Sequence, residues 1–259
     1  MKTFRILSLA VIAAMLMTFV SCLDSGNNTS TGTVYGVVDY NDSFKKVVVY
    51  GLDGGVYYVP TIVNDASLQS GDCVGVYGTI DYGSAENANA SVNGYYVMVA
   101  SQYEKYTSYY ATSFMPSDTT SVQTGEMPII ATSSLGSGTY IKGHLFLALQ
   151  FANIKSDQKN SFSLSYNLSK VNTENGSRVY DIYVRAKKVE DGSKSASSAY
   201  LTVPFEMNNF FTQATAVEKG LGNTAINVRL NYISALNSDS TKAIWTKSDV
   251  YSYTISSSK

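Results

Sequence analysis

The feature that most constrains the fold is a strict alternation of apolar and polar residues in the second half of the chain. In the stretch YIKGHLFLALQF, residues 140–151, one side of an extended strand carries only apolar side chains, namely Ile141, Leu145, Leu147, Leu149 and Phe151. The other side carries Lys142, His144 and Gln150. The alternation returns in FSLSYNL, VYDIYVRA, AYLTVPF, INVRLNY and VYSYTI. This period of two is typical of half-buried β-strands, and in VYDIYVRA it places Asp181 and Arg185 opposite the apolar face.

One stretch of the second half has helical spacing instead. Its apolar residues recur as on one face of a helix, at Phe210, Phe211, Ala214, Val217 and Leu221. The stretch follows Asn208-Asn209 and ends near Gly220, which are suitable residues for the two ends of a helix. Residues 128–259 are therefore predicted to form a β-sandwich domain with one short helix.

The first half, residues 33–110, has about five strand candidates. Asp53-Gly54 lies between residues 47–50 and 56–59, a pattern that predicts a hairpin because this dipeptide suits a tight turn. Gly75 and Gly78 would let the strand in GDCVGVYGTI bend sharply, and residues 84–93 are expected to be a polar loop. Five bent strands in this length favour a small OB-like barrel, with an open sandwich as the alternative. Both halves make the chain all-β.

The alternation stops between the two halves. Residues 111–127 are rich in Ser and Thr and hold Pro116, and Pro128 follows directly. We expect this stretch to be the linker between two β-domains.

The N-terminus has the order of a secretory signal. Lys2 and Arg5 precede an apolar run at residues 6–20, which is short for a membrane-spanning helix, and the small Ser21 follows. Residues 19–22, Phe-Val-Ser-Cys, resemble a bacterial lipobox, although Phe19 stands where Leu is usual. The resemblance implies that residues 1–21 are removed and that Cys22 is lipidated. Several acyl chains, at about 0.8 kcal/mol per buried methylene, would hold the chain firmly on a membrane. Residues 22–32 are then expected to be the lipidated cysteine and a flexible tether.

Catalytic and metal-binding motifs are not recognisable in the sequence. Cys73 is the only other cysteine, which excludes an intrachain disulfide with a lipidated Cys22, and we expect it to be a small buried side chain. The single histidine, His144, falls on the polar face of its strand and is expected at the surface. The sequence lacks a Gly-x-Ser-x-Gly elbow, a His-Glu-x-x-His motif and a phosphate-binding glycine loop. It therefore predicts a protein that is not an enzyme and has no cofactor, although carboxylates brought together in space would escape this interpretation.

The charge argues against nucleic acid as a partner. Without Lys2 and Arg5, 17 basic residues face 20 acidic ones, and Lys45-Lys46 is the only basic cluster of the barrel. Tyrosines are abundant, however, and the doubled pairs Tyr57-Tyr58, Tyr95-Tyr96 and Tyr109-Tyr110 place one ring on each face of a strand. Rings outside the core could stack on sugars.

With both halves laid out, the chain resembles the NigD-like lipoproteins of Bacteroidetes. The features that carry the resemblance are VSCLD, the hairpin leading into LQSGDCVGVYGTI, and the strand order that ends in INVRLNY. The resemblance implies a lipobox, an OB-like domain, a C-terminal β-sandwich and an envelope location. It implies no catalytic residues.

Two classes of function stay open. The first is a non-catalytic, membrane-tethered adaptor that binds another envelope protein, with an immunity role as a special case. The second is a glycan-binding lipoprotein. The lipid anchor points to the outer membrane, but Asp24 alone after Cys22 leaves the leaflet open. Thr119 and Ser240 lie in Asp-Ser/Thr-x triplets that resemble the O-glycosylation acceptors of Bacteroidetes.

Overall fold

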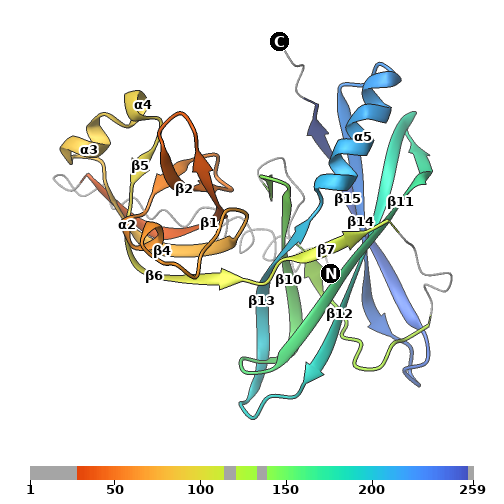
Figure 1. Cartoon of the computed structure of the whole chain (residues 1–259). Coiled ribbons are helices and arrows are strands. Elements are labelled where there is room, and N and C mark those ends of the chain that lie inside the picture. Colours follow the sequence, from red (N-terminus) through yellow and green to blue (C-terminus); the bar gives the residue numbers. More distant parts are fainter. Residues whose placement is uncertain (1–27, 114–120, 133–138, 256–259) are drawn as a thin grey trace. The chain divides into compact units, whose positions relative to one another are not determined.

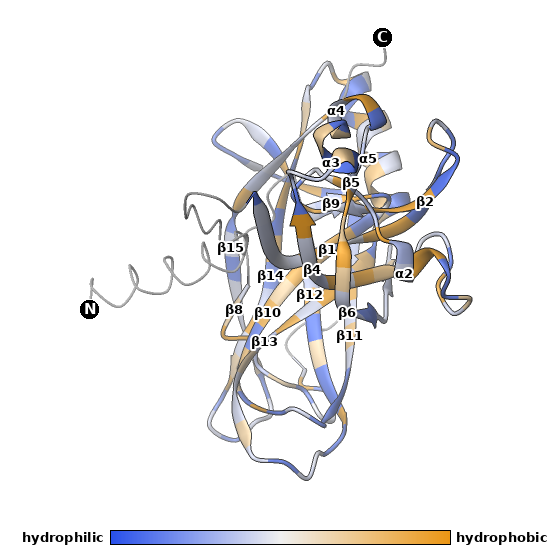
Figure 2. Cartoon of the chain, turned by 90° about the vertical axis from the view of Figure 1, so that its left-hand side faces the viewer, coloured by the Kyte–Doolittle hydropathy of each residue, from blue (hydrophilic) through white to orange (hydrophobic). Residues whose placement is uncertain are grey.

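The computed structural model describes residues 28–113, 121–132 and 139–255 (Figure 1). These residues form two compact units, which divide between Tyr106 and Thr107. Almost all regular structure is strand, and the prediction of an all-β chain is confirmed. Figure 2 shows hydrophobic and hydrophilic residues interleaved along the strands, as the alternation in the sequence predicts.

The first unit is built on a six-stranded sheet in the order β5-β3-β2-β1-β4-β6. Its elements are β1 (Thr29–Asn41), β2 (Lys46–Gly51), β3 (Val56–Tyr58), α2 (Pro60–Val63), β4 (Cys73–Asp81), α3 (Ala85–Ala88), α4 (Ala90–Asn93), β5 (Tyr96–Val97) and β6 (Val99–Tyr106). The predicted hairpin is present, since β2 pairs with β3 across a turn in which Gly54 has φ +84°. The predicted loop at residues 84–93 is instead two short helices, the first of which is capped by the Ser84 hydroxyl.

Two close approaches explain why glycines occur inside these strands. A Cβ on Gly36 would lie 2.1 Å from the Tyr50 carbonyl oxygen on the neighbouring strand. A Cβ on Gly78 would lie 2.4 Å from the Val99 carbonyl oxygen, and the β4–β6 register shifts at this point. The bend predicted at Gly78 therefore coincides with a bulge. Cys73 is buried, as expected from its strand position.

The start of β1 differs from the sequence expectation. The tether was expected to reach residue 32, but β1 begins at Thr29, which pairs with Asp81 of β4. The backbone of residues 29–32 is therefore part of the sheet, because β4 is long enough to continue the ladder beyond the apolar stretch of β1.

The second unit is one nine-stranded sheet with a helix. Its elements are β7 (Tyr109–Thr112), β8 (Ala131–Thr132), β9 (Tyr140–Ile141), β10 (His144–Lys155), β11 (Lys159–Glu174), β12 (Ser177–Glu190), β13 (Ala196–Glu206), α5 (Asn208–Gly220), β14 (Ala225–Leu236) and β15 (Ala243–Thr254). The order is β15-β14-β12-β11-β7-β13-β10-β8, and β9 pairs with β10. The sequence predicts a sandwich of two sheets, whereas here β7 pairs with both β11 and β13 and joins the two halves into one sheet.

Residues 121–132 form backbone hydrogen bonds with three strands of the sheet. Met127 N–H donates to Ala186 of β12, Ile129 N–H to Ile233 of β14, and Ile130 N–H to Gln150 of β10. Ile129 is fully buried in the core of the unit. The described parts of the predicted linker at residues 111–127 thus contact the second unit, because their backbone groups form hydrogen bonds with its strands.

The predicted helix is α5, which lies beside the ends of β11 and β14 (Figure 1). Phe210, Phe211 and Ala214 are buried as expected, and Phe210 packs edge-on against Tyr166 and Tyr180. Val217 and Leu221, which share the helical spacing, are 45% and 58% exposed.

Two polar residues, Glu218 and His144, are buried in this unit. Glu218 of α5 takes the inward position instead of Val217, because it accepts hydrogen bonds from Tyr180, Arg178 and Asn223. His144 was expected at the surface but is only 8% exposed, and its Nδ1 lies 3.1 Å from the Lys142 carbonyl oxygen. The start of β10 is buried on both faces, which the alternation alone does not reveal.

Candidate functional site

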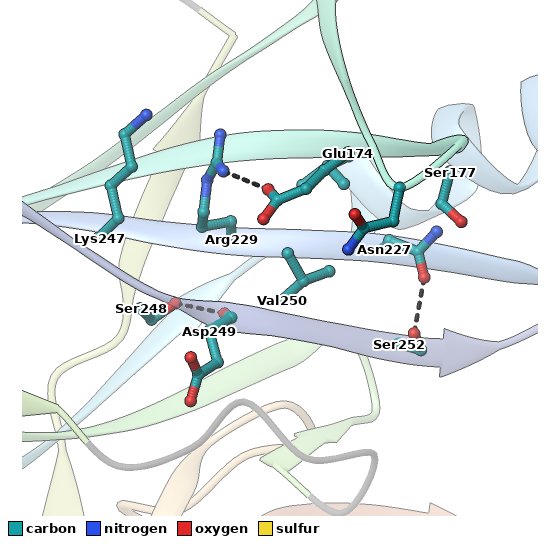
Figure 3. Close-up of a pocket in the computed structure, with 11 residues that line it drawn as sticks. Glu174, Ser177, Asn227, Arg229, Lys247, Ser248, Asp249, Val250 and Ser252 are labelled. Carbon is teal, nitrogen blue, oxygen red and sulfur yellow. Dashed lines mark hydrogen bonds and ion pairs between the residues drawn. The ribbon is translucent and has the colours of Figure 1, made fainter.

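The candidate site is a pocket on the second unit, lined by β12, β14, β15 and the turn between β11 and β12 (Figure 3). We call it the outer-face pocket, because its residues lie opposite the apolar face of the sheet. Its volume is about 550 Å³. The turn is formed by Asn175 and Gly176, whose positive φ angles of 51° and 78° reverse the chain tightly.

Arg229 of β14 is a cation of the pocket that is held by three hydrogen bonds to carboxylates. Its Nε and Nη2 donate to the two oxygens of Asp181 on β12, at 2.7 and 3.1 Å, and its Nη1 donates to Glu174 at 2.6 Å. Only 12% of the Arg229 side chain is exposed. The paired hydrogen bonds to one carboxylate fix the plane of the guanidinium group.

Asp181 is held in its charged form. Burial raises its pKa, but hydrogen bonds from Arg229 and Asn231 outweigh burial, and the pKa lies below its ordinary value. The same contact with Asp181 raises the pKa of Arg229. The pair therefore stays ionised at neutral pH. It fixes the position of the Arg229 guanidinium group, which lines the pocket.

Hydroxyl and amide groups line the rest of the pocket. Ser252 donates to the Asn227 side-chain oxygen at 2.6 Å, and the Asn227 amide donates to the Arg178 carbonyl at 3.0 Å. Ser248 accepts from the Leu230 N–H at 2.9 Å. Figure 3 shows Lys247 and Arg229 side by side, with Glu174 across from Arg229. The pocket thus offers both donors and acceptors within a short span.

Two aromatic clusters occupy the edge of the barrel. Tyr96 packs against Tyr57 and Tyr82, with ring centroids 6.4 and 5.6 Å apart. On the other side, Tyr58 packs against Tyr95 at 5.8 Å, and the Lys46 ammonium lies 4.2 Å from the Tyr58 ring centre. The expectation that each doubled tyrosine pair divides between two faces agrees with this arrangement.

Of the three modification sites predicted from the sequence, Cys22 and Thr119 lie outside the described residues. Ser240 lies exposed in the turn between β14 and β15, where it has φ +58°. Among the described residues, no group of three or more His, Cys, Asp and Glu is placed to hold a metal ion. In the same part of the chain, no helix is both long and apolar enough to span a bilayer.

The sequence pattern singles out Asp181 but not its neighbours Arg229, Glu174 and Lys247. A signal was available, because an ionisable residue in the middle of a buried strand needs a partner on the next strand. Which strand that is does not follow from the sequence, since β12 and β14 are parallel neighbours separated by β13 and α5 along the chain.

Residues 26–104 match the family model described as a lipoprotein OB domain. This segment has the fold of a lipoprotein OB domain. The match confirms the predicted OB-like barrel and the resemblance to OB-domain lipoproteins. A lipoprotein domain also indicates a protein of the cell envelope.

Solved structures extend the similarity beyond the barrel. An uncharacterised protein from Parabacteroides merdae is 29% identical, with a TM-score of 0.73, and the alignment covers 87% of this chain and all of that one. A candidate lipoprotein from Bacteroides fragilis shares the fold at 14% identity, with a TM-score of 0.57 and the same coverage of both chains. A NigD-like immunity protein from Bacteroides caccae matches at 12% identity and a TM-score of 0.42, over 86% of this chain and 93% of that one. No curated protein sequence matches the chain. None of these three structures is described as an enzyme.

Proposed function

We propose that the protein is a non-catalytic binding module, anchored by lipid on Cys22 in the outer membrane, that holds its ligand in the outer-face pocket. The observation that carries the proposal is the fixed guanidinium group of Arg229, which forms a rigid polar floor between Asp181 and Glu174. Binding sites combine a concave shape with a few polar groups held in place before the ligand arrives. The partner is an envelope protein or an envelope glycan.

The anchor is tested by fractionation. The Cys22→Ala variant should leave the membrane fraction, because it has no thiol to receive a lipid. The wild-type chain should remain with the membranes through a high-salt wash, since an acyl anchor is not electrostatic. Sedimentation of Cys22→Ala with membranes at the wild-type level would contradict the anchor.

The binding role is tested by affinity capture from detergent-solubilised envelopes. The full chain is compared with a Lys247→Gln, Glu174→Gln double variant, which changes two side chains of the pocket that are partly or fully exposed. We expect a component that the wild type retains and the double variant loses. Identical sets captured by both chains would show that the pocket is not the binding site.

A second candidate function, glycan binding at the barrel, is favoured by Tyr82 and Tyr96. These rings are 42% and 36% exposed and meet nearly at right angles, at 82°. Exposed aromatic faces stack on the apolar faces of sugars. Loss of glycan binding in Tyr82→Ala and Tyr96→Ala, with the pocket intact, would support this candidate over the first.

We also propose that Thr119 and Ser240 are O-glycosylated. Asp239 accepts from the Thr241 N–H and hydroxyl, so the turn presents Ser240 outward to an enzyme. Intact mass measurement of protein from its native host should show added glycan that decreases in Thr119→Ala and Ser240→Ala. An unmodified mass for the wild type would exclude both sites.

A further inference from the structure

We infer that the outer-face pocket binds a neutral, hydroxyl-rich ligand of the saccharide class. The inference rests on the proposed binding function and adds the chemistry of the ligand. Three properties of the pocket carry it: its balance of charge, its mixture of donors and acceptors, and the lack of aromatic residues in its described lining.

The pocket has no excess of positive charge. Its lining residues include two cations, Arg229 and Lys247, and two carboxylates, Glu174 and Asp249, and Arg229 also binds the carboxylate of Asp181. Sites for phosphate or carboxylate ligands present an excess of cationic donors. Here Arg229 already binds two carboxylates, so an anionic ligand would meet no surplus positive charge.

Donors and acceptors both occur among the residues that line the pocket. Lys247, the Ser177 hydroxyl and the Arg229 hydrogens not bound to Asp181 or Glu174 can donate, whereas Glu174 and the amide oxygen of Asn175 can accept. A sugar hydroxyl donates one hydrogen bond and accepts others, so neighbouring hydroxyls of one ring suit such mixed pairs. The volume of about 550 Å³ lies within the range of about 300–1,000 Å³ typical of small-ligand pockets.

Large apolar side chains do not occur among the described residues that line the pocket. Val179 and Val250 are the only apolar residues of its described lining, and none of that lining is aromatic. Protein partners usually insert an aromatic or aliphatic anchor into a desolvated pocket. The absence of such a pocket in the described lining favours a saccharide over a peptide segment.

The experiment is calorimetric titration of the full chain in detergent with maltohexaose, mannohexaose and chitohexaose, and with hexagalacturonate as the anionic counterpart. We expect at least one neutral hexasaccharide to bind and hexagalacturonate to bind more weakly. Lys247→Gln and Glu174→Gln should each lower the affinity for the neutral ligand about tenfold, because each removes a hydrogen bond from a charged group. Lys194→Gln and Glu190→Gln, which change exposed residues near the turn between β12 and β13, are the matched controls and should leave the affinity unchanged.

Three results would overturn the inference: no neutral hexasaccharide binds, hexagalacturonate binds more tightly, or the two pocket variants bind like their controls. The envelope capture described above separates these failures from failure of the proposed function. If the double variant loses a captured protein while the neutral sugars do not bind, the binding module stands and its ligand is a protein.

Discussion

The strands of the barrel unit pack closely through glycines, whereas the second unit pairs three buried carboxylates with arginines. In the barrel, Gly36 and Gly78 leave no room for a Cβ against neighbouring backbone, and the ion pairs Lys45–Asp42 and Lys105–Asp72 are exposed or partly exposed to solvent. In the second unit, Glu126, Asp181 and Glu218 are at most 9% exposed and each binds an arginine. Close backbone packing therefore limits which residues the barrel strands can hold, whereas the second unit depends on the pairing of buried charges.

The largest effect is expected from Glu126→Gln. The side chains of Glu126 and Arg185 are 0% and 5% exposed, so the substitution leaves a buried guanidinium without its counter-charge. Breaking a buried pair in this way costs about 3–5 kcal/mol of the free energy of unfolding. Trp245 is the only tryptophan and lies 5.6 Å from the Arg185 guanidinium, so urea denaturation followed by its fluorescence reports on this unit.

The matched control is Glu190→Gln, which breaks the exposed pair with Lys159 and should change the free energy of unfolding little. Equal losses in the two variants would mean that the buried pair has no special role.

The next effect is expected from Gly36→Ala in the barrel. The new Cβ would lie 2.1 Å from a backbone oxygen, so two strands must separate. Overpacking of this kind costs about 1–3 kcal/mol. Hydrogen exchange of the β1 and β2 amides measures the loss in this unit alone.

Gly220→Ala is the control for a glycine in open space, since a Cβ added to Gly220 would have no atom within 4 Å and this residue ends α5. It should be neutral or slightly stabilising. If Gly36→Ala were as stable as Gly220→Ala, the barrel would not depend on close backbone contact.

The smallest effect is a difference in acid sensitivity. For Asp181 and Glu218, burial raises the pKa, but hydrogen bonds from arginine and other neighbours lower it below its ordinary value. A carboxyl group with a lowered native pKa stabilises the folded state above its unfolded pKa of about 4, and this contribution is lost as the pH falls through the native pKa. We therefore expect the second unit to lose stability below about pH 4.

Thermal unfolding from about pH 7 to about pH 2, followed by Trp245 fluorescence, measures this loss. Asp181→Asn should be less stable at neutral pH and show a flatter acid dependence, whereas Asp42→Asn, at an exposed turn, should follow the wild type. If the stability of Asp181→Asn fell with decreasing pH as steeply as that of the wild type, the acid sensitivity would come from other groups.

The sequence predicts the parts of this molecule that follow from local pattern. Alternation revealed the long strands of the second unit, Asp53-Gly54 revealed the β2–β3 hairpin, and the spacing of Phe210 and Ala214 revealed α5. Each of these signals depends on a few neighbouring residues, which is why one sequence is enough to recognise them.

The candidate site could not be predicted in the same way. Glu174, Arg229 and Lys247 come from three separate segments, which meet only because β14 lies parallel to β12. His144 was misplaced because the start of β10 is buried on both faces, which the local alternation does not reveal. Residues 121–132 carry no periodic pattern, because their backbone bonds to three different strands in turn.

The position of β7 sets the order in which the second unit can assemble. β7 leaves the ribosome before every other strand of its sheet, yet it is parallel to both neighbours, and its partner Phe205 follows much later in the chain. Contacts of such long range slow folding, because the loop must close before the pairing stabilises it. During synthesis, one edge of β7 therefore lacks its partner strand until β13 has been made. Any product truncated before β13 has that edge of β7 unpaired. Completion of the sheet is consequently a late event in the synthesis of the protein.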